Sequence, residues 1–291
     1  MISSLGLERR SSDTAPRFMG LMELAKKYEI EAVRAFVTQH IKNDWPTTLE
    51  EWQGQQAEIA RLEEKHCRAC HPSRAEAEAP YLSSLFPEPA SVIKLCMKYH
   101  IHEPLSAAFY QLSLIKPADD FDRWKNENGK PWKYSQLQRG DINYPGPLDH
   151  WRRTARWSLL DGDVFMRLLL GREALDDIRR VFVVPRASKT CTRGGQYRSC
   201  SKELEEIYGT KFTTTHGEPL GFFEHCARVA LELKSRACDS CYERNRGLLD
   251  TVMQRIWSQL PHVFSVTEVC TPVFPSRAVS ALLTMFQRQL L

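Results

Sequence analysis

The stretch Leu24-Ala25-Lys26-Lys27-Tyr28-Glu29-Ile30 decides the fold, because it returns later in the chain as Leu95-Cys96-Met97-Lys98-Tyr99-His100-Ile101. Each copy adjoins apolar residues spaced three and four apart, the period of an amphipathic helix. A second stripe of the same period follows each copy, over Ile30–Ile41 and Leu105–Ile115. We therefore expect two packed helical hairpins, with the Leu, Tyr and Ile of both copies in the core.

Residues that start and stop helices support this interpretation. Pro46 ends the second helix, and Thr48 with Glu51 forms a capping box for a helix to Leu62. Asp161 is suited to cap a helix that ends near Gly171. Further helices are predicted from Arg172 to about Arg180, over Phe222–Leu233 and over Leu248–Leu260, and the two strand candidates are Val181–Val184 and Phe212–Thr215.

The composition is that of a globular protein. The 291 residues are 42% hydrophobic and 26% charged, and the formal net charge of +4 is too small to indicate nucleic-acid binding. The most apolar run, Val164–Leu170, is short and contains Arg167, so no membrane span is expected. The N-terminus lacks an apolar signal core, which favours the cytoplasm or nucleus or both.

Changes in composition divide the chain into five regions. Residues 1–15 are polar and expected to be disordered, 16–115 hold the helical hairpins, and 116–155 form a polar linker with turn signals at Asn128-Gly129 and Pro145-Gly146. Residues 156–265 form a second helical region, and 266–291 a tail. The predicted fold is mainly α, with packed helical hairpins in one or two subdomains and a long polar loop between them.

Motifs beyond the repeated stretch follow in a recognisable order. Leu85-Phe86-Pro87-Glu88-Pro89 leads into Ala107-Ala108-Phe109-Tyr110, and Leu168-Leu169-Leu170-Gly171-Arg172-Glu173 comes later. Cys238-Asp239-Ser240-Cys241 and Trp257-Ser258-Gln259-Leu260-Pro261 stand near the end. This order resembles the BTB/POZ-domain proteins of mushroom-forming fungi, in which a helical region follows the BTB fold. The resemblance covers roughly residues 17–115 and 156–265 and implies binding to other proteins.

The strand-rich BTB core is missing from the resemblance. Residues 17–45 resemble the closing helices of such a domain, and nothing that resembles its strands precedes them. We expect either a truncated gene product or a lineage that lost the core. BTB dimerisation and recruitment of a cullin ligase, which the core surface carries in that family, are therefore not carried over to this chain. The tail from Cys270 to Leu291 matches no part of the resemblance.

Nine cysteines in a chain without a secretion signal favour reduced thiols or metal ligands over disulfides. The string His66-Cys67-Arg68-Ala69-Cys70-His71 contains the C-x-x-C-H signature of c-type haem attachment. Haem attachment needs export or mitochondrial targeting, and zinc ligands packed into six residues would form a strained site. We interpret this string as free thiols.

A better-spaced cysteine set lies further on. Cys191 and Cys200 lie in a Gly- and Arg-containing loop, and Cys238 and Cys241 form a C-x-x-C between two predicted helices. Ligand pairs from two segments are typical of structural zinc sites, although the first pair is spaced more widely than usual. His225 and Cys226 are alternative ligands. Buried free cysteines remain the competing interpretation, and a thioredoxin-like role would need a strand–helix context that the sequence lacks.

The sequence gives little support for nucleic-acid binding or catalysis. Trp151-Arg152-Arg153 with Arg156-Trp157 alternates aromatic and basic groups, as single-strand nucleic-acid sites do, but we interpret it as a solvated face. Phosphate-binding loops and catalytic constellations are not recognisable. The sequence thus predicts a non-enzymatic protein-binding module without cofactor, with no nucleic-acid or membrane partner. The alternative is a structural zinc-binding or thiol-dependent regulatory protein, and the partner and oligomeric state stay open.

Overall fold

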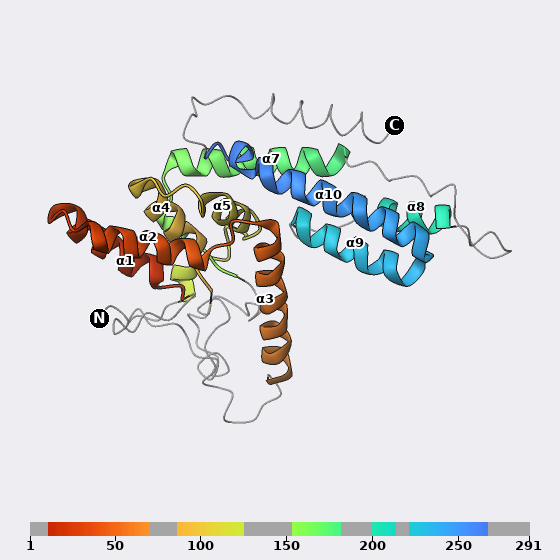
Figure 1. The fold of residues 1–291 in the computed structure, drawn as a ribbon, viewed down its shortest axis with the longest axis horizontal. Helices are drawn as coiled ribbons and strands as arrows, with labels where there is room; N and C mark the ends of the chain where they lie inside the picture. Colours follow the sequence, from red (N-terminus) through yellow and green to blue (C-terminus); the bar gives the residue numbers. More distant parts are fainter. Residues whose placement is uncertain (1–10, 70–85, 125–152, 182–199, 214–220, 267–291) are drawn as a thin grey trace. The chain divides into compact units, whose positions relative to one another are not determined.

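The computed structural model describes residues 11–69, 86–124, 153–181, 200–213 and 221–266, and in these ranges the fold is mainly α, as predicted (Figure 1). Strands are absent from these ranges, and a single isolated bridge joins Asp120 and Ala155. The chain divides into two compact units, Met1–Phe165 and Met166–Leu291. Residues 156–165, grouped with the second helical region from the sequence, belong to the first unit.

The two repeated stretches form the same turn. Helix α1 (Thr14–Lys27) is followed by α2 (Glu31–Asp44), and α4 (Pro89–Tyr99) by α5 (Leu105–Ser113). Glu29 and His100 hold equivalent positions with φ of 54° and 58°. The next residue donates its N–H five residues back, Ile30 to Ala25 and Ile101 to Cys96, both at 2.9 Å. These are the bonds of a left-handed helix C-terminus, so both predicted hairpins are confirmed.

The predicted core positions of the two copies differ. Leu95 and Ile101 are buried at 0% and 4% exposure, whereas Leu24, Tyr28 and Ile30 are 53%, 61% and 44% exposed. The core prediction is therefore wrong for the first copy. The buried stripe of α1 is narrow and consists of Ala15, Phe18, Met22 and Ala25. Leu24 lies about 160° around the helix from Met22, while α4 buries a wide face from Val92 to Cys96.

Helix α3 (Leu49–Ala69) begins at the predicted capping box. Thr48 Oγ1 accepts the Glu51 N–H at 3.2 Å, and Glu51 Oε2 accepts the N–H groups of Thr47 and Thr48 at 2.7 and 3.2 Å. The helix continues seven residues beyond the predicted end at Leu62. Trp52 packs edge-on against Tyr110 of α5, with ring centroids 5.1 Å apart, and this contact anchors α3 to the second hairpin.

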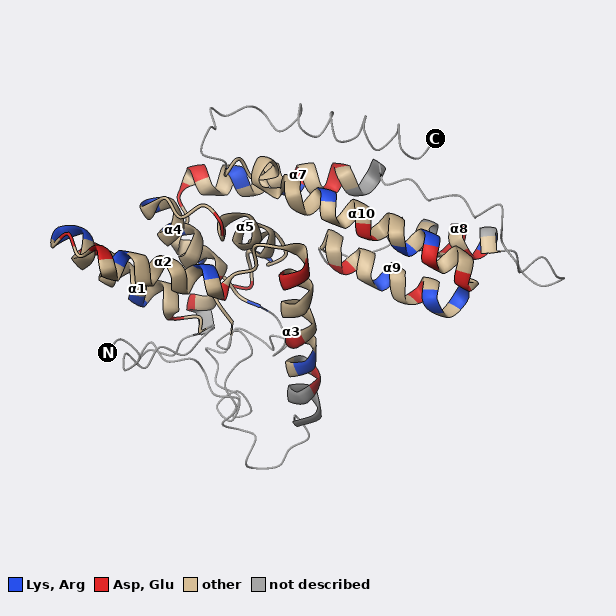
Figure 2. Ribbon diagram, in the orientation of Figure 1, with Lys and Arg blue, Asp and Glu red and all other residues tan. Residues whose placement is uncertain are grey.

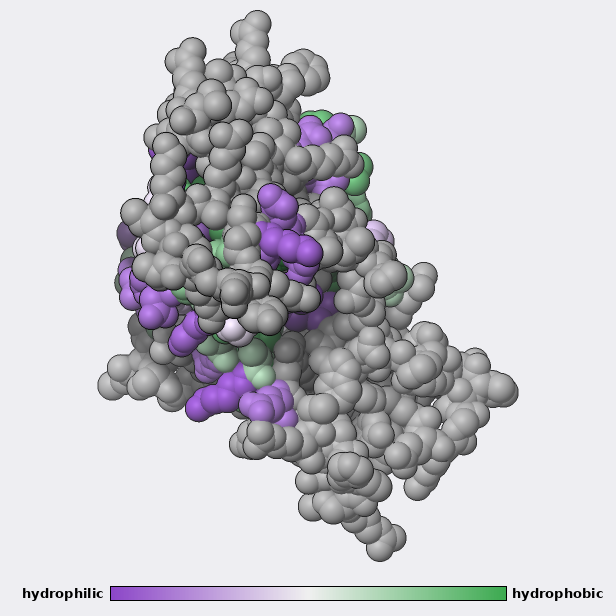
Figure 3. Space-filling view, turned by 90° about the vertical axis from the view of Figure 1, so that its right-hand side faces the viewer, coloured by the Kyte–Doolittle hydropathy of each residue, from purple (hydrophilic) through white to green (hydrophobic). Residues whose placement is uncertain are grey.

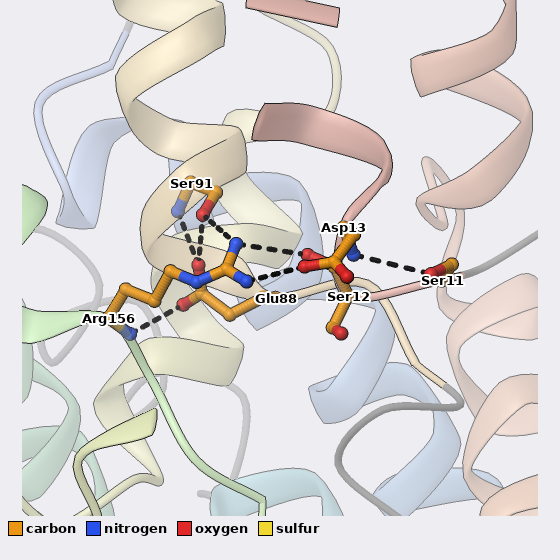
Figure 4. A network of polar contacts seen from close by, with 6 residues as sticks. All are labelled: Ser11, Ser12, Asp13, Glu88, Ser91 and Arg156. Carbon is orange, nitrogen blue, oxygen red and sulfur yellow. Dashed lines mark hydrogen bonds and ion pairs between the residues drawn. The ribbon is translucent and has the colours of Figure 1, made fainter. Parts of the chain in front are cut away.

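A buried polar network closes the first unit (Figure 4). The Arg156 guanidinium donates to the Ser12 carbonyl at 3.2 Å, to Ser91 Oγ at 3.2 Å and to Asp13 Oδ1 at 2.6 Å. The Arg156 N–H donates to Glu88 Oε1 at 3.0 Å. The same guanidinium lies 4.3 Å from the centroid of the Phe121 ring. The network joins segments about 65 and 140 residues apart in sequence, which explains why residues 153–165 pack in this unit.

The second unit is built from α7 (Gly162–Val181, from Met166 onward), α8 (Cys200–Thr213), α9 (Phe222–Arg236) and α10 (Asp239–Val263). The Asp161 cap of α7 is confirmed, since Asp161 Oδ1 accepts the Val164 N–H at 2.9 Å. The predicted end at Gly171 is wrong, because α7 continues to Val181. Gly171 is instead a packing position, where a Cβ atom would collide with the Phe264 ring.

Three further predictions about the second unit need correction. Phe212 and Thr213 lie at the end of α8 and not in a strand, and Val181 is helical, whereas residues 182–184 and 214–215 lie outside the described ranges. Cys200 begins a helix that the sequence reading took for a loop. Helix α10 starts at Asp239, nine residues before the predicted Leu248, so the C-x-x-C belongs to its first turn.

Within the described ranges, neither sign of charge is confined to particular helices. Acidic and basic residues are intermixed along the helices (Figure 2), and hydrophilic side chains predominate among the described residues on the face in Figure 3. Within the described ranges, no helix has both the length and the apolar content that crossing a bilayer requires.

Candidate metal centre

Three of the four predicted metal ligands come together in the second unit. Cys200 is the first residue of α8, Cys238 is the N-cap of α10, and Cys241 lies in the first turn of α10. Their Sγ atoms all lie within 4.8 Å of one another. The fourth predicted ligand, Cys191, lies outside the described residues.

The packing of α8 against α9 fixes this meeting point. Arg236, the last residue of α9, donates to Glu203 Oε2 and to Glu206 Oε2 of α8, both at 2.6 Å. Two residues later the chain reaches Cys238, whose N–H donates to Cys200 Sγ at 3.5 Å. The ion pairs hold the end of α9 against the start of α8, so the following turn delivers the C-x-x-C beside Cys200.

The three cysteines differ in exposure. Cys200 and Cys241 are 1% and 0% exposed, and Cys238 is partly buried. Ala237 and Tyr242 pack around them. Cys238 and Cys241 stand at the N-terminus of a 25-residue helix, where the helix dipole favours negative charge and therefore the thiolate form.

The sulfur spacing suits a soft metal ion. A tetrahedral zinc ion with Zn–S bonds of about 2.3 Å places its sulfur ligands about 3.8 Å apart. Sulfur atoms within 4.8 Å of one another reach that spacing through small side-chain movements. Three cysteines with one more ligand form a structural zinc site of the Cys₄ or Cys₃His type. In the described ranges, this is the single cluster of three or more Cys, His, Asp or Glu with metal-ligand spacing.

The alternative ligands His225 and Cys226 lie elsewhere. Both are buried in α9 and neither belongs to the cysteine cluster. Burial, together with the nearby Glu224 and Asp250 carboxylates, raises the pKa of the Cys226 thiol well above its ordinary range. Burial likewise raises the pKa of the Cys96 thiol in α4. These two cysteines remain protonated at neutral pH and fit the interpretation of buried free thiols.

The other sequence candidates do not assemble a site in the described ranges. His66 to Ala69 lie at the end of α3 without described side chains, and residues 70–71 fall outside the description. Arg156 and Trp157 are buried, so the interpretation as a solvated face is wrong for these two residues. Arg153 donates to the Pro87 carbonyl at 2.9 Å, and residues 151–152 lie outside the described ranges.

A polar pocket in the first unit offers no catalytic arrangement. It has a volume of about 250 Å³ and is lined by Lys42, Asn43, Asp44, Trp45, Pro46, Glu51 and Gln55. Its Glu51 carboxylate is engaged in capping α3, and the Thr47 N–H is the main cause that holds the pKa of this carboxyl below its usual value. Lys42 pairs with Glu103 at 2.5 Å.

Comparisons with family models, with curated proteins and with solved structures gave no match. The C-x-x-C spacing is the sequence feature that predicted the cysteine cluster. The sequence named Cys200 as a ligand, but its spacing from Cys191 is wider than usual in zinc sites. The ion pairs of Arg236 that bring Cys200 close join residues about 30 positions apart, so sequence spacing does not reveal them.

Proposed function

We propose that this chain is a non-enzymatic helical scaffold for protein binding, and that its second unit holds one structural zinc ion. The convergence of the Cys200, Cys238 and Cys241 sulfur atoms within 4.8 Å carries the metal part of this proposal. The site lies where α8 meets the turn between α9 and α10. A metal ion there ties three helices together, which is the role of a structural site.

Burial favours a structural over a catalytic metal. Catalytic zinc keeps a position open to water and substrate, whereas structural zinc has four protein ligands. Two of the three cysteines are at most 1% exposed, which leaves little access for a substrate. Cys191 is our proposed fourth ligand, on the basis of its position in the sequence.

Metal analysis of the purified full chain tests this proposal. We expect about one equivalent of zinc in the wild-type protein, and its loss in Cys200→Ser and in the double variant Cys238→Ser/Cys241→Ser. Cys191→Ser should weaken binding. The matched control is Ser240→Ala, since Ser240 is exposed in the same turn and offers no sulfur. A metal-free wild-type protein with intact helical content would contradict the proposal, as would zinc that survives the double substitution.

An exposed apolar turn supports the protein-binding part. Leu24, Tyr28 and Ile30 are each more than 40% exposed at the turn between α1 and α2. Exposed aromatic and aliphatic side chains that lie together are typical of protein interaction sites. The Lys27 ammonium lies 5.3 Å from the centroid of the Tyr28 ring. The resemblance to the helical region of fungal BTB/POZ proteins points to the same class of function and remains part of the proposal.

Affinity purification from the native cell tests protein binding. We expect a reproducible partner that the wild-type chain captures and that Tyr28→Ser/Ile30→Ser loses. Leu231→Ser is the control, because Leu231 is 71% exposed but lies on α9 in the other unit. If no partner is recovered reproducibly, or if the control removes it equally, this turn is not the binding surface.

A further inference from the structure

We propose that Cys238 and Cys241 form a reversible dithiol–disulfide pair, and that oxidation of this pair by a hydroperoxide releases the metal ion. The release of metal rests on the proposed function, whereas disulfide formation does not. The pair would make the second unit sensitive to oxidants as well as metal-dependent.

The geometry of the pair carries the first step. Cys238 is the N-cap of α10 with φ −74° and ψ 159°, and Cys241 follows three residues later in the first turn. Their Sγ atoms lie within 4.8 Å of each other. A disulfide needs a separation of about 2.05 Å, so the two sulfur atoms must approach by at most about 2.7 Å. Because the extended N-cap residue lies outside the helix, rotation of its side chain covers this distance without unwinding the helix.

Exposure assigns the two cysteines different roles. Cys238 is the least buried of the three cysteines, while Cys241 is 0% exposed, so Cys238 is the one that an oxidant from solution meets first. The thiolate is the nucleophile towards peroxides. Cys241, protected from solvent and in the same turn, is placed to resolve the oxidised Cys238. Cys200 is also close, but it comes from α8, so a disulfide to it would cross-link two helices, whereas Cys241 belongs to the same helix start as Cys238.

The chemistry balances with hydrogen peroxide as the oxidant. The Cys238 thiolate attacks one peroxide oxygen, the O–O bond breaks, and hydroxide leaves, which gives a sulfenic acid. The Cys241 thiolate then attacks the Cys238 sulfur, the S–O bond breaks, and a second hydroxide leaves. Two thiols and one peroxide thus become one disulfide and two waters, and the two sulfur atoms together lose two electrons. A disulfide sulfur is a poor zinc ligand, so a zinc ion held by Cys200, Cys238 and Cys241 would lose two of its ligands on oxidation and would be released.

Reduction reverses the change. A small thiol attacks the disulfide and forms a mixed disulfide, and a second thiol then frees the protein sulfur. The products are the two protein thiols and one disulfide of the small thiol. The buried Cys96 and Cys226 do not take part, because their pKa values are raised by burial and they remain thiols.

Peptide mapping of the oxidised full chain tests the pairing. The zinc-loaded protein is treated with a small excess of hydrogen peroxide, digested without reductant and analysed by mass spectrometry, while a chromogenic chelator records released zinc. We expect a Cys238–Cys241 disulfide, about one zinc released per disulfide, and full reversal by dithiothreitol. In Cys241→Ser, dimedone should label Cys238 as a sulfenic acid. In Cys238→Ser, neither product should form, and Ser240→Ala should behave as wild type.

The outcomes separate the two proposals. A Cys200–Cys238 disulfide, or a pair that stays reduced while other cysteines oxidise, overturns the dithiol assignment whether or not metal is present. A Cys238–Cys241 disulfide in a protein that never bound zinc supports the pair and contradicts the proposed metal site. Zinc that stays bound after the disulfide has formed overturns the coupling. Mapping of the wild-type chain gives these answers even if a variant fails to fold.

Discussion

Two helix starts, one in each unit, show two different ways of closing a packed helical unit. Helix α4 begins at Glu88, whose carboxylate accepts the N–H groups of Ala90 and Ser91, each at 2.8 Å. Helix α10 begins at Cys238, whose side chain makes no capping hydrogen bond. Each helix start also contacts a residue from a distant segment, which is Arg156 in the first unit and Cys200 in the second.

The difference lies in the charges that each site brings together. The α4 start combines the Glu88 and Asp13 carboxylates with the Arg156 guanidinium, so protein groups supply both signs. The α10 start combines three sulfur ligands, which carry charge of the same sign once ionised. Once ionised, three thiolates need a positive ion. The first unit is thus closed by its own side chains, and in our account the second is closed by zinc.

Metal removal should produce the largest effect and should affect the second unit alone. A ligand present at a thousand times its Kd stabilises a fold by about 4 kcal/mol, and chelation removes that contribution. We expect faster hydrogen–deuterium exchange over 200–208 and 239–245, with 89–99 unchanged. Equal changes in exchange rate in both units, or no change in either, would contradict the claim that metal stabilises the second unit alone.

Arg156→Ala should have the next largest effect and should affect the first unit. It removes the guanidinium donors to Ser91 Oγ, to the Ser12 carbonyl and to Asp13, whereas the backbone N–H that Glu88 accepts remains. The buried acceptors left without a donor should cost about 3 kcal/mol. Urea unfolding measures the loss, and Arg156→Lys should recover part of it because the charge returns without the two-pronged geometry. Zinc content should not change. If Arg156→Ala unfolds at the wild-type urea midpoint, the network is not what closes this unit.

Gly171→Ala tests packing in the second unit independently of metal. The added methyl group would collide with the Phe264 ring, and overpacking of this kind costs about 2 kcal/mol. Gly247→Ala is the matched control, since no side chain or neighbouring backbone lies within 4 Å of a Cβ atom there. Removing a helical glycine should stabilise α10 by up to about 1 kcal/mol. Thermal unfolding that moves both variants in the same direction would contradict this packing.

Glu51→Gln should have the smallest effect and a defined pH dependence. Hydrogen bonds, chiefly from the Thr47 N–H, lower the pKa of Glu51 in the folded chain. A lowered folded pKa means that its stabilisation is complete above the unfolded value near 4.5 and is lost as pH falls through the folded value. At pH 7 the substitution should cost about 0.5 kcal/mol, because Gln keeps an acceptor for the same N–H groups and loses only the negative charge. The difference from wild type should shrink towards pH 3, and a pH-independent difference would show that Glu51 acts by packing.

Local signals predicted much of the fold. The repeated Leu-x-x-Lys-Tyr-x-Ile stretch predicted both hairpin turns, and Thr48 and Asp161 predicted two helix starts. What failed depended on contacts between distant residues. The sequence does not show that Gly171 meets Phe264 inside a continuous helix, or that Arg156 turns inward to Ser12 and Asp13. It also does not show that the first copy of the repeat lies at an exposed turn.

The same limit applies to the candidate site. The C-x-x-C spacing identified Cys238 and Cys241 because both ligands lie within one turn. Cys200 stands 38 residues before Cys238, and only the pairing of Arg236 with Glu203 and Glu206 brings it close. All three cysteines were among the ligands predicted from the sequence, but only the tertiary structure shows that Cys200 of α8 lies beside the two cysteines of α10.

X-ray absorption at the zinc edge of the purified full chain tests the metal site most directly. The account predicts bound zinc with at least three sulfur ligands at about 2.3 Å, and a loss of sulfur scattering in Cys238→Ser/Cys241→Ser. Bound zinc surrounded by nitrogen and oxygen alone, or a wild-type protein that retains no zinc, would contradict the central claim that a metal ion closes the second unit.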